Sequence, residues 1–306
     1  MAPTGQQYEI RSGDARAVVT GVGAGLRAFV VRGTHHVETY DEDAAPPMGA
    51  GCVLLPWPNR TAGARFTWRG ETHDLEVTEA ARGHAIHGLV RHRAWSVVVH
   101  DEAAITLAVD VPGGADPEAH GWPQPLHVET TYGVDGDRGA LTVSHSVTNT
   151  GDGDVPAGIG THPYLRAGDH PSDDCTLLVA TATVLDVDDA LVPTGPAREV
   201  TPGESLRGGR PVAELDLDTC FGASGGVAGV LAELRAPDGT GTRLWGDRNV
   251  TWVQAFTPDS PFGRPGKAVA VEPMTCPPDA LNSGTDLVVL QPGATWTVRW
   301  GLEALP

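Results

Sequence analysis

The sequence predicts an all-β fold in which large antiparallel sheets pack face to face as a β-sandwich. Short runs rich in Val, Thr and aromatic residues recur along the whole chain. The 39 Gly and 25 Pro residues are scattered between these runs, where they end strands and form turns. No segment keeps apolar residues at the spacing i, i+3, i+4, i+7 over three turns, so a helical bundle or a βαβ plan is disfavoured.

The expected strands, in chain order, lie at residues 27–33, 95–100, 104–111, 140–149, 176–187 and 295–302. The run 140–149 alternates Leu141, Val143 and Val147 with polar neighbours, which is typical of a strand with one buried face. The loops at 41–51 and 187–204 are too short and too mixed in composition to separate domains. We therefore expect one domain over residues 1–306.

Charge and hydropathy exclude several classes of partner. The chain has a net charge of −18, its only lysine is Lys267, and no basic run could neutralise a phosphate backbone, so a nucleic-acid partner is disfavoured. The longest apolar runs are well short of the roughly 20 residues of a membrane helix. The first ten residues lack the features of a secretory signal, which predicts a cytoplasmic protein. Neither composition nor pattern predicts the oligomeric state.

Several known catalytic motifs are present only in part and lack residues that their chemistry requires. Residues 222–226 fit the G-x-S-x-G form of a hydrolase elbow, but no histidine follows His170, so we expect a glycine-rich surface turn. The four cysteines are far apart, which predicts reduced thiols and neither a disulfide framework nor a zinc site. The histidine pairs at 35–36 and 84–87 do not form a zinc motif, and no Walker or dinucleotide loop is present. We expect no metal and no cofactor.

Four segments place chemically active side chains among turn-forming residues. Each side chain by itself has an ordinary structural explanation, such as a surface ion pair or a hydrogen-bonded core histidine. Together, guanidinium, imidazole and carboxylate groups on corners stiffened by Pro and Gly are what a preorganised site for a polyol requires. The segments are LPWPNR (55–60), HAIHG (84–88), GIGTHPYLR (158–166) and AVAVEPMTCPPDALN (268–282).

These segments, in this order, resemble the aldose 1-epimerase (galactose mutarotase) family. The resemblance also includes Gly63, Phe66 and Gly70 after the first segment, the block from Asn149 to Tyr164, and LDTCF at 217–221. It covers nearly the whole chain. It implies a galactose mutarotase-like supersandwich with a sugar cleft on one concave sheet, and it implies interconversion of the α and β anomers of a free hexose such as glucose or galactose.

The resemblance also assigns roles to residues. It implies Glu272 as general base and His162 as general acid, and the unperturbed pKa values of the two residue types would give them opposite charges near neutral pH. It implies that Arg60, His87, Asp218 and Asn59 contact the sugar, with Asp216 as an alternative to Asp218. The sequence departs from the family pattern at Cys276 and Asp279, which we expect to affect loop packing or sugar preference. Trp57 is an alternative surface for stacking the sugar, although a Trp between two prolines suits core packing.

Two other functions fit the same residues. A non-catalytic carbohydrate-binding protein would use a similar cleft without needing an acid opposite a base. An epimerase acting on a phosphorylated hexose would need several cationic side chains converging on the phosphate. Arg82, Arg91 and Arg93 lie near His87 in the sequence and keep this second alternative open.

Overall fold

The largest sheet of the fold contains nine strands. The structure is a computed structural model that describes residues 2–223 and 229–306. This sheet is antiparallel throughout. In spatial order its strands are β10 (Ser96–His100), β11 (Ala104–Val111), β12 (Leu126–Asp135), β13 (Ala140–Asn149), β27 (Thr295–Leu305), β23 (Gly241–Gly246), β22 (Val230–Arg235), β17 (Thr176–Val179) and β20 (Arg210–Pro211).

A second, eight-stranded antiparallel sheet carries much of the candidate site. The strand β16 pairs with β25 outside the main path of this sheet. The remaining strands follow one another in the order β19 (Arg198–Glu199), β18 (Thr181–Val184), β21 (Asp218–Ala223), β24 (Trp252–Phe256), β25 (Val269–Met274), β15 (Gly160–Thr161) and β5 (Val53–Leu54), with β16 spanning Tyr164–Leu165.

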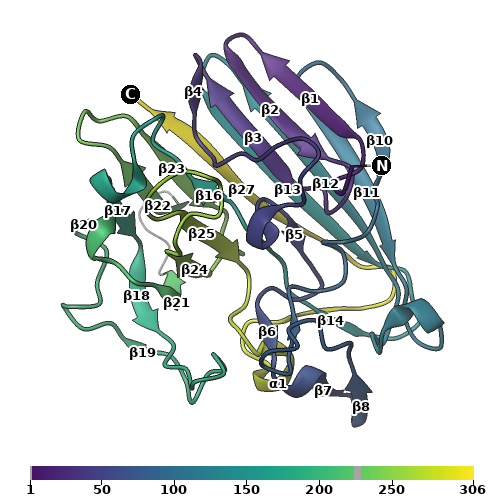
Figure 1. Cartoon of the computed structure of the whole chain (residues 1–306). Helices are drawn as coiled ribbons and strands as arrows, with labels where there is room; N and C mark the ends of the chain where they lie inside the picture. Colours follow the sequence, from purple (N-terminus) through teal and green to yellow (C-terminus); the bar gives the residue numbers. More distant parts are fainter. Residues whose placement is uncertain (1, 224–228) are drawn as a thin grey trace.

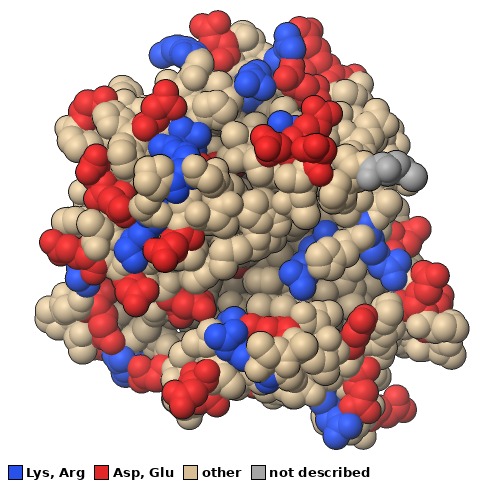
Figure 2. Space-filling model, in the orientation of Figure 1, with Lys and Arg blue, Asp and Glu red and all other residues tan. Residues whose placement is uncertain are grey.

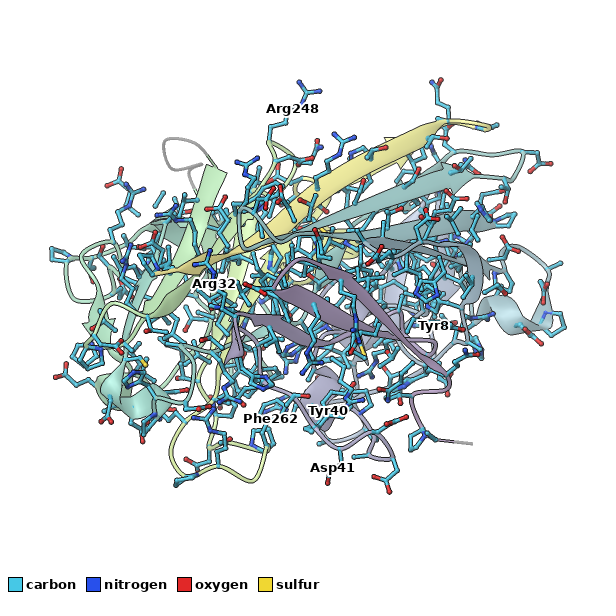
Figure 3. The ribbon with its side chains drawn as sticks, turned by 90° about the horizontal axis from the view of Figure 1, so that it is seen from above. Tyr8, Arg32, Tyr40, Asp41, Arg248 and Phe262 are labelled. Atoms are coloured by element: carbon cyan, nitrogen blue, oxygen red, sulfur yellow. The ribbon has the colours of Figure 1, made fainter. Side chains whose placement is uncertain are left out.

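The N-terminal four strands form a separate sheet that lies across β11 and β12 (Figure 1). Figure 3, seen from above, shows the same two layers stacked. The Tyr132 hydroxyl of β12 joins them by donating to the Ala24 carbonyl at 2.6 Å. These four strands are β1 (Gln7–Ser12), β2 (Ala15–Thr20), β3 (Leu26–Val31) and β4 (Thr34–His35).

Short elements complete the described chain. The two-stranded pairs are β14 (Val155–Ala157) with β26 (Val288–Leu290), β6 (Arg60–Thr61) with β9 (Ala85–Ile86), and β7 (Arg65–Trp68) with β8 (Glu71–Asp74). The α-helix α1 covers Ala280–Ser283, and short 3-10 turns lie at Pro47–Gly49, Ala62–Ala64, Pro117–Ala119, Ser172–Asp174 and Val212–Glu214. In the described residues, no helix has the length and apolar character needed to cross a bilayer.

The main hydrophobic core lies between the sheets and draws residues from both ends of the chain. Its buried members run from Ile10 on β1 to Leu302 on β27, and Val253 on β24 belongs to the same cluster. On β13, Leu141, Val143 and Val147 are buried, as the alternation predicts, and the polar residues His145 and Asn149 occupy the two other buried positions of the same pattern. The face drawn in Figure 2 carries basic and acidic side chains interspersed, with no continuous basic stripe.

The prediction of an all-β sandwich is confirmed, with one strand wrong. The runs 104–111 and 140–149 coincide with β11 and β13. The run 176–187 is not one strand, because the chain leaves the nine-stranded sheet after Val179 and joins the eight-stranded sheet at Thr181. Both parts are rich in strand-forming residues, so their composition does not reveal the change of sheet. Most of the glycine-rich segment 222–226 lies outside the described residues.

Candidate active site

The six residues predicted for the site all line one cavity of about 460 Å³. They come from four separate segments and from the start of β21. The structure therefore assembles the segments that the sequence singled out separately. The lining consists of Asn59, Arg60, His87, His162, Asp218 and Glu272, together with Met48, Thr78, Glu79, Arg82, Ile86, Arg91 and Phe256.

An imidazole and a carboxylate face each other inside this cavity. His162 Nε2 lies 3.4 Å from Glu272 Oε1, and the two residues are only 4% and 2% exposed. The second carboxylate oxygen, Glu272 Oε2, and the second ring nitrogen, His162 Nδ1, have no hydrogen-bond partner among the described residues. Buried polar atoms are normally satisfied, so orphaned atoms beside a cavity indicate places where a ligand can bind.

Neighbouring strands position the carboxylate. Glu272 lies on β25 directly opposite Gln254 of β24, and Asp218 begins the next strand, β21. The Gln254 amide donates to Asp218 Oδ1 at 2.6 Å, which holds the Asp218 side chain beside Glu272. Asp216 precedes the strand, is exposed and does not line the cavity. The structure therefore favours Asp218 over the alternative Asp216.

Aromatic packing positions the imidazole. His162 lies between β15 and β16, where its ring stacks on Tyr164 with centroids 5.0 Å apart and an interplanar angle of 18°. Tyr164 in turn meets the edge of Phe262 at 5.0 Å. Figure 3 shows Phe262 near Tyr40, which belongs to the same small hydrophobic cluster. This packing restricts the rotamer of His162, as a preorganised acid or base requires.

The second histidine is held as a hydrogen-bond donor. The His87 N–H donates to the Asn59 carbonyl at 2.9 Å, and the Asn59 N–H donates to His87 Nδ1 at 3.2 Å. Both residues have left-handed backbones, with φ of 65° and 53°, which this reciprocal contact stabilises. Because Nδ1 accepts a hydrogen bond, the proton of neutral His87 lies on Nε2. Burial lowers the pKa of His87 well below 6.5, and nearby His162 and Arg91 lower it further.

Three of these residues could in principle bind a metal ion. Potential ligand atoms of His87, His162 and Glu272 lie within 4.8 Å of one another. A metal, however, binds the lone pair of an imidazole nitrogen, and the Asn59 N–H already occupies that of His87 Nδ1. Nε2 then carries the proton and presents a donor to the cavity. The donor set therefore fits an oxygen of a substrate better than a cation.

The Arg60 side chain is held by the carboxylate of Glu79, a residue that the sequence analysis did not identify. Its Nε and Nη2 donate to Glu79 Oε2 and Oε1 at 2.8 and 3.0 Å. Arg82 binds the same carboxylate at 2.9 Å. Burial by itself would raise the pKa of Glu79, but its contacts with Arg60 and Arg82 lower it overall. Glu79 lies in a loop with no recognisable motif, so nothing in the sequence marks it. Gln254 was also missed, although a polar residue inside the apolar run WVQAF is a detectable signal.

The remaining predicted positions support the site or lie outside it. Asp279 holds the Arg60 corner, because its N–H donates to the Arg60 carbonyl at 2.7 Å and its Oδ1 accepts from the Ala62 N–H at 2.9 Å. Cys276 is fully buried and does not line the cavity. Trp57 packs in the core against Trp122, with centroids 5.7 Å apart, and does not line the cavity either.

Burial changes the protonation expected for the acid–base pair. It raises the pKa of Glu272 well above its usual value, with a smaller contribution from Asp218, and lowers the pKa of His162 to about 4. Both shifts favour neutral side chains, whereas unperturbed values predict opposite charges. Relative to a carboxylate and a neutral imidazole, the pair of a neutral glutamic acid and a neutral histidine holds one additional proton. The pair of a carboxylate and an imidazolium holds the same number. The pair therefore holds one proton between two buried sites.

Comparison with known proteins places the chain in a family. The sequence matches the aldose 1-epimerase family over residues 6–303. The Escherichia coli K12 protein YihR, described as uncharacterized, is 29% identical over 290 residues, which cover 95% of this chain and 90% of YihR. The family match extends from the first strand, β1, into the last strand, β27.

Solved structures show the same fold. The GalM/aldose epimerase homologue from C. elegans superposes with a TM-score of 0.83 at 20% identity and covers 98% of both chains. The galactose 1-epimerase from Lactobacillus acidophilus NCFM has a TM-score of 0.77 at 16% identity, covering 96% of this chain and 92% of that chain. The motifs, the sandwich and a family match over nearly the whole chain agree, so this protein belongs to the aldose 1-epimerase family.

Proposed function

We propose that the protein is an aldose 1-epimerase that interconverts the α and β anomers of a hexose such as glucose or galactose. The observation that carries the proposal is the pair of His162 and Glu272, 3.4 Å apart in a cavity and each with an unpartnered polar atom among the described residues. Ring opening of an aldose needs one group to take a proton from the C1 hydroxyl and another to protonate the ring oxygen. Two buried sites that share one proton suit this task.

In the proposed mechanism, Glu272 takes the proton of the C1 hydroxyl while His162 protonates the ring oxygen, and the ring opens to the aldehyde. Rotation about the C1–C2 bond presents the other face of the carbonyl, and the two groups exchange roles as the ring closes. The starting form requires the shared proton on His162. Sugar hydroxyls that donate to the unpartnered Glu272 Oε2 would favour this form, because hydrogen bonds to a carboxylate stabilise its charge.

The surrounding groups bind and orient the sugar. Nε2–H of His87 and the guanidinium of Arg60 can donate to ring or C1 oxygens as negative charge develops. Asp218 accepts from sugar hydroxyls. The Asn59 Oδ1 already accepts the Arg60 N–H at 2.9 Å, which leaves its NH₂ group for a substrate oxygen. We further infer that residues 1–306 act as one domain, since the main core includes residues of β1, β24 and β27.

The decisive experiment measures anomer exchange on freshly dissolved glucose and galactose by polarimetry. We expect Glu272→Gln and His162→Asn each to lower kcat by about 100-fold or more, because each removes a proton-transfer group. Glu199→Gln and His100→Asn are matched controls on exposed strand positions and should retain activity. Circular dichroism would verify folding. A folded Glu272→Gln variant with near-wild-type turnover would contradict the assignment of the base.

The same measurements separate the enzyme from a non-catalytic carbohydrate-binding protein. Such a protein would bind hexoses, as titration calorimetry measures, without accelerating exchange above the spontaneous rate. The buried pair favours the enzyme, because sugar binding alone does not require a carboxylate and an imidazole to be desolvated against each other.

A further inference from the structure

One cationic side chain of the cavity, Arg91, forms no ion pair with any described residue, although the charge of Glu79 acts on it. Arg91 lines the cavity and is half-buried, yet no described residue offers its guanidinium a hydrogen bond or an ion pair. The two other arginines of the lining, Arg60 and Arg82, both bind Glu79. Burial lowers the pKa of Arg91, which reflects the cost of keeping an unpaired charge there.

The charge balance of the cavity lining is unusual for so acidic a chain. The lining holds three arginines and three carboxyl groups, so its formal charge is balanced in a protein whose net charge is −18, and two of the three guanidinium groups share the Glu79 carboxylate. The two other acidic groups of the lining, Asp218 and Glu272, lie on the strands β21 and β25. A guanidinium that forms no ion pair attracts anions, and the planar fork of arginine suits phosphate and carboxylate oxygens.

Arg91 follows His87 by four residues, and both residues line the same cavity as His162. The positive charge of Arg91 lowers the pKa of both His87 and His162, while the charges that act on Glu272 are those of Asp218 and Arg60. Under the proposed function, His162 serves the ring oxygen. In a hexopyranose the ring oxygen is bonded to C5, and C5 carries C6. A substituent on C6 would therefore lie on the His162 side of the bound ring, in the cavity that Arg91 also lines.

We propose that Arg91 is a specificity-determining residue that binds an anionic group on C6 of the hexose, a phosphate or a carboxylate. This inference rests on the proposed function, because it uses the ring orientation that the acid–base roles impose. It adds a substrate class, C6-anionic hexoses, which are expected to be used with a higher kcat/KM than glucose. The same acid–base pair would act on both kinds of sugar.

The test compares glucose, glucose 6-phosphate and glucuronate in the wild type and in Arg91→Gln. Exchange NMR gives the anomer-exchange rates, with the spontaneous rate subtracted. We expect the wild type to prefer an anionic sugar, and the ratio of its kcat/KM to that for glucose to fall by about 10- to 100-fold in Arg91→Gln, mainly through KM, as loss of a charged hydrogen bond predicts. The anionic sugar whose kcat/KM falls more in Arg91→Gln, glucose 6-phosphate or glucuronate, identifies phosphate or carboxylate as the preferred group.

A neighbouring arginine provides the matched control. Arg93 binds the Glu118 carbonyl at 3.1 Å and lies outside the cavity, so Arg93→Gln should leave both the ratio and the rates unchanged. Equal losses for glucose and for both anionic sugars in Arg91→Gln, or a wild type with no preference for either anion, would overturn the inference.

A binding measurement keeps this outcome separate from failure of the proposed function. Titration calorimetry of Glu272→Gln with glucose 6-phosphate and glucuronate needs no turnover. Weaker binding of either anion after the additional change Arg91→Gln would support the role of Arg91 even if no sugar were epimerised. Unchanged binding of both would contradict it.

Discussion

The protonation of Glu272 and His162 depends on their burial more than on their intrinsic chemistry. Unperturbed pKa values predict a carboxylate and an imidazolium near neutral pH. Removal of both groups from water favours a neutral pair instead, with the one proton able to lie on either residue. A base whose pKa exceeds that of its acid partner is suited to exchanging roles, as ring opening and reclosure require.

The pH dependence of activity should report this shared proton. At pH values below the acid limb of the activity profile, the pair of Glu272 and His162 takes up a second proton, and Glu272 can no longer act as base. Because burial lowers the pKa of His162 to about 4, we expect this limb near pH 4. Above the alkaline limb the shared proton is lost, and no acid remains. Since the pKa of Glu272 is raised well above its usual value, kcat/KM should be constant from above pH 4 up to an alkaline limb that lies well above the usual range of a carboxyl group.

Polarimetric kcat/KM values across the pH range would check this profile, with near-UV circular dichroism verifying the fold at each pH. A limb near pH 6.5 would show that the histidine titrates at its ordinary value. In that case the burial argument would be wrong even if both residues are essential.

At the scale of the strand, β13 shows how a core position can hold a titratable residue. His145 continues the buried alternation of this strand and pairs with Thr130 of β12. Its Nε2 accepts the Trp300 indole N–H of β27 at 2.9 Å, so its Nδ1 carries the proton and donates to Thr130 Oγ1 at 2.9 Å. Protonation of Nε2 would replace that acceptor with a second donor. Burial lowers the pKa of His145 to about 3.

Acid should therefore destabilise the protein through its buried histidines. Below pH 6.5 the unfolded chain binds a proton that native His145 does not, so this stabilisation is present above pH 6.5 and is lost as pH falls toward 3. The free energy of unfolding should fall by up to about 1.4 kcal/mol per pH unit for each such histidine. In urea unfolding, His145→Gln should be less stable at pH 7 but should lose less stability between pH 7 and pH 5.

An exposed histidine on β12 gives the contrasting control. The hydrogen bond from His127 to Asp110 is the main factor that raises the pKa of His127. Its contribution to stability is present below pH 6.5 and is lost as pH rises through the raised value. His127→Gln should therefore steepen the loss of stability on acidification. A His145→Gln variant with the wild-type pH dependence would contradict the role of this histidine.

At the scale of the whole molecule, separate sheets must be held together before the site exists. The hydrogen bond from the Tyr132 hydroxyl to the Ala24 carbonyl joins the N-terminal sheet to the nine-stranded sheet. Both Tyr132 and Ala24 are fully buried. Tyr132→Phe leaves a buried carbonyl unsatisfied and should lower the free energy of unfolding by about 1–3 kcal/mol.

Urea unfolding would measure this loss. Tyr8→Phe is the matched control on β1, where the ring packs against His100 and the residue is partly exposed. Its stability should change by less than about 0.5 kcal/mol. Equal stability of Tyr132→Phe and the wild type would show that the contact between layers depends on apolar packing alone.

Local patterns account for the strands and for the residues that the motifs identify. The alternation of Leu141, Val143 and Val147 predicts a strand with a buried face, because side chains alternate across a sheet. The motifs around Arg60, His87, His162 and Glu272 predict the groups that line the cavity. The strand expected at 176–187 was wrong, because a change of sheet at Ala180 depends on partners elsewhere in the chain.

The sequence by itself determined the all-β class, most of the strand-forming runs and the choice of His162 and Glu272 as the proposed acid and base, because these follow from local periodicity and from short motifs. Only the tertiary structure decided which distant groups meet: Glu79 lies beside Arg60, Gln254 lies beside Asp218, and Arg91 lines the cavity without an ion-pair partner among the residues that the structure describes. It also decided the protonation of His162 and Glu272. Charge pairing and desolvation depend on distances across the folded chain, and no local pattern in the sequence contains those distances.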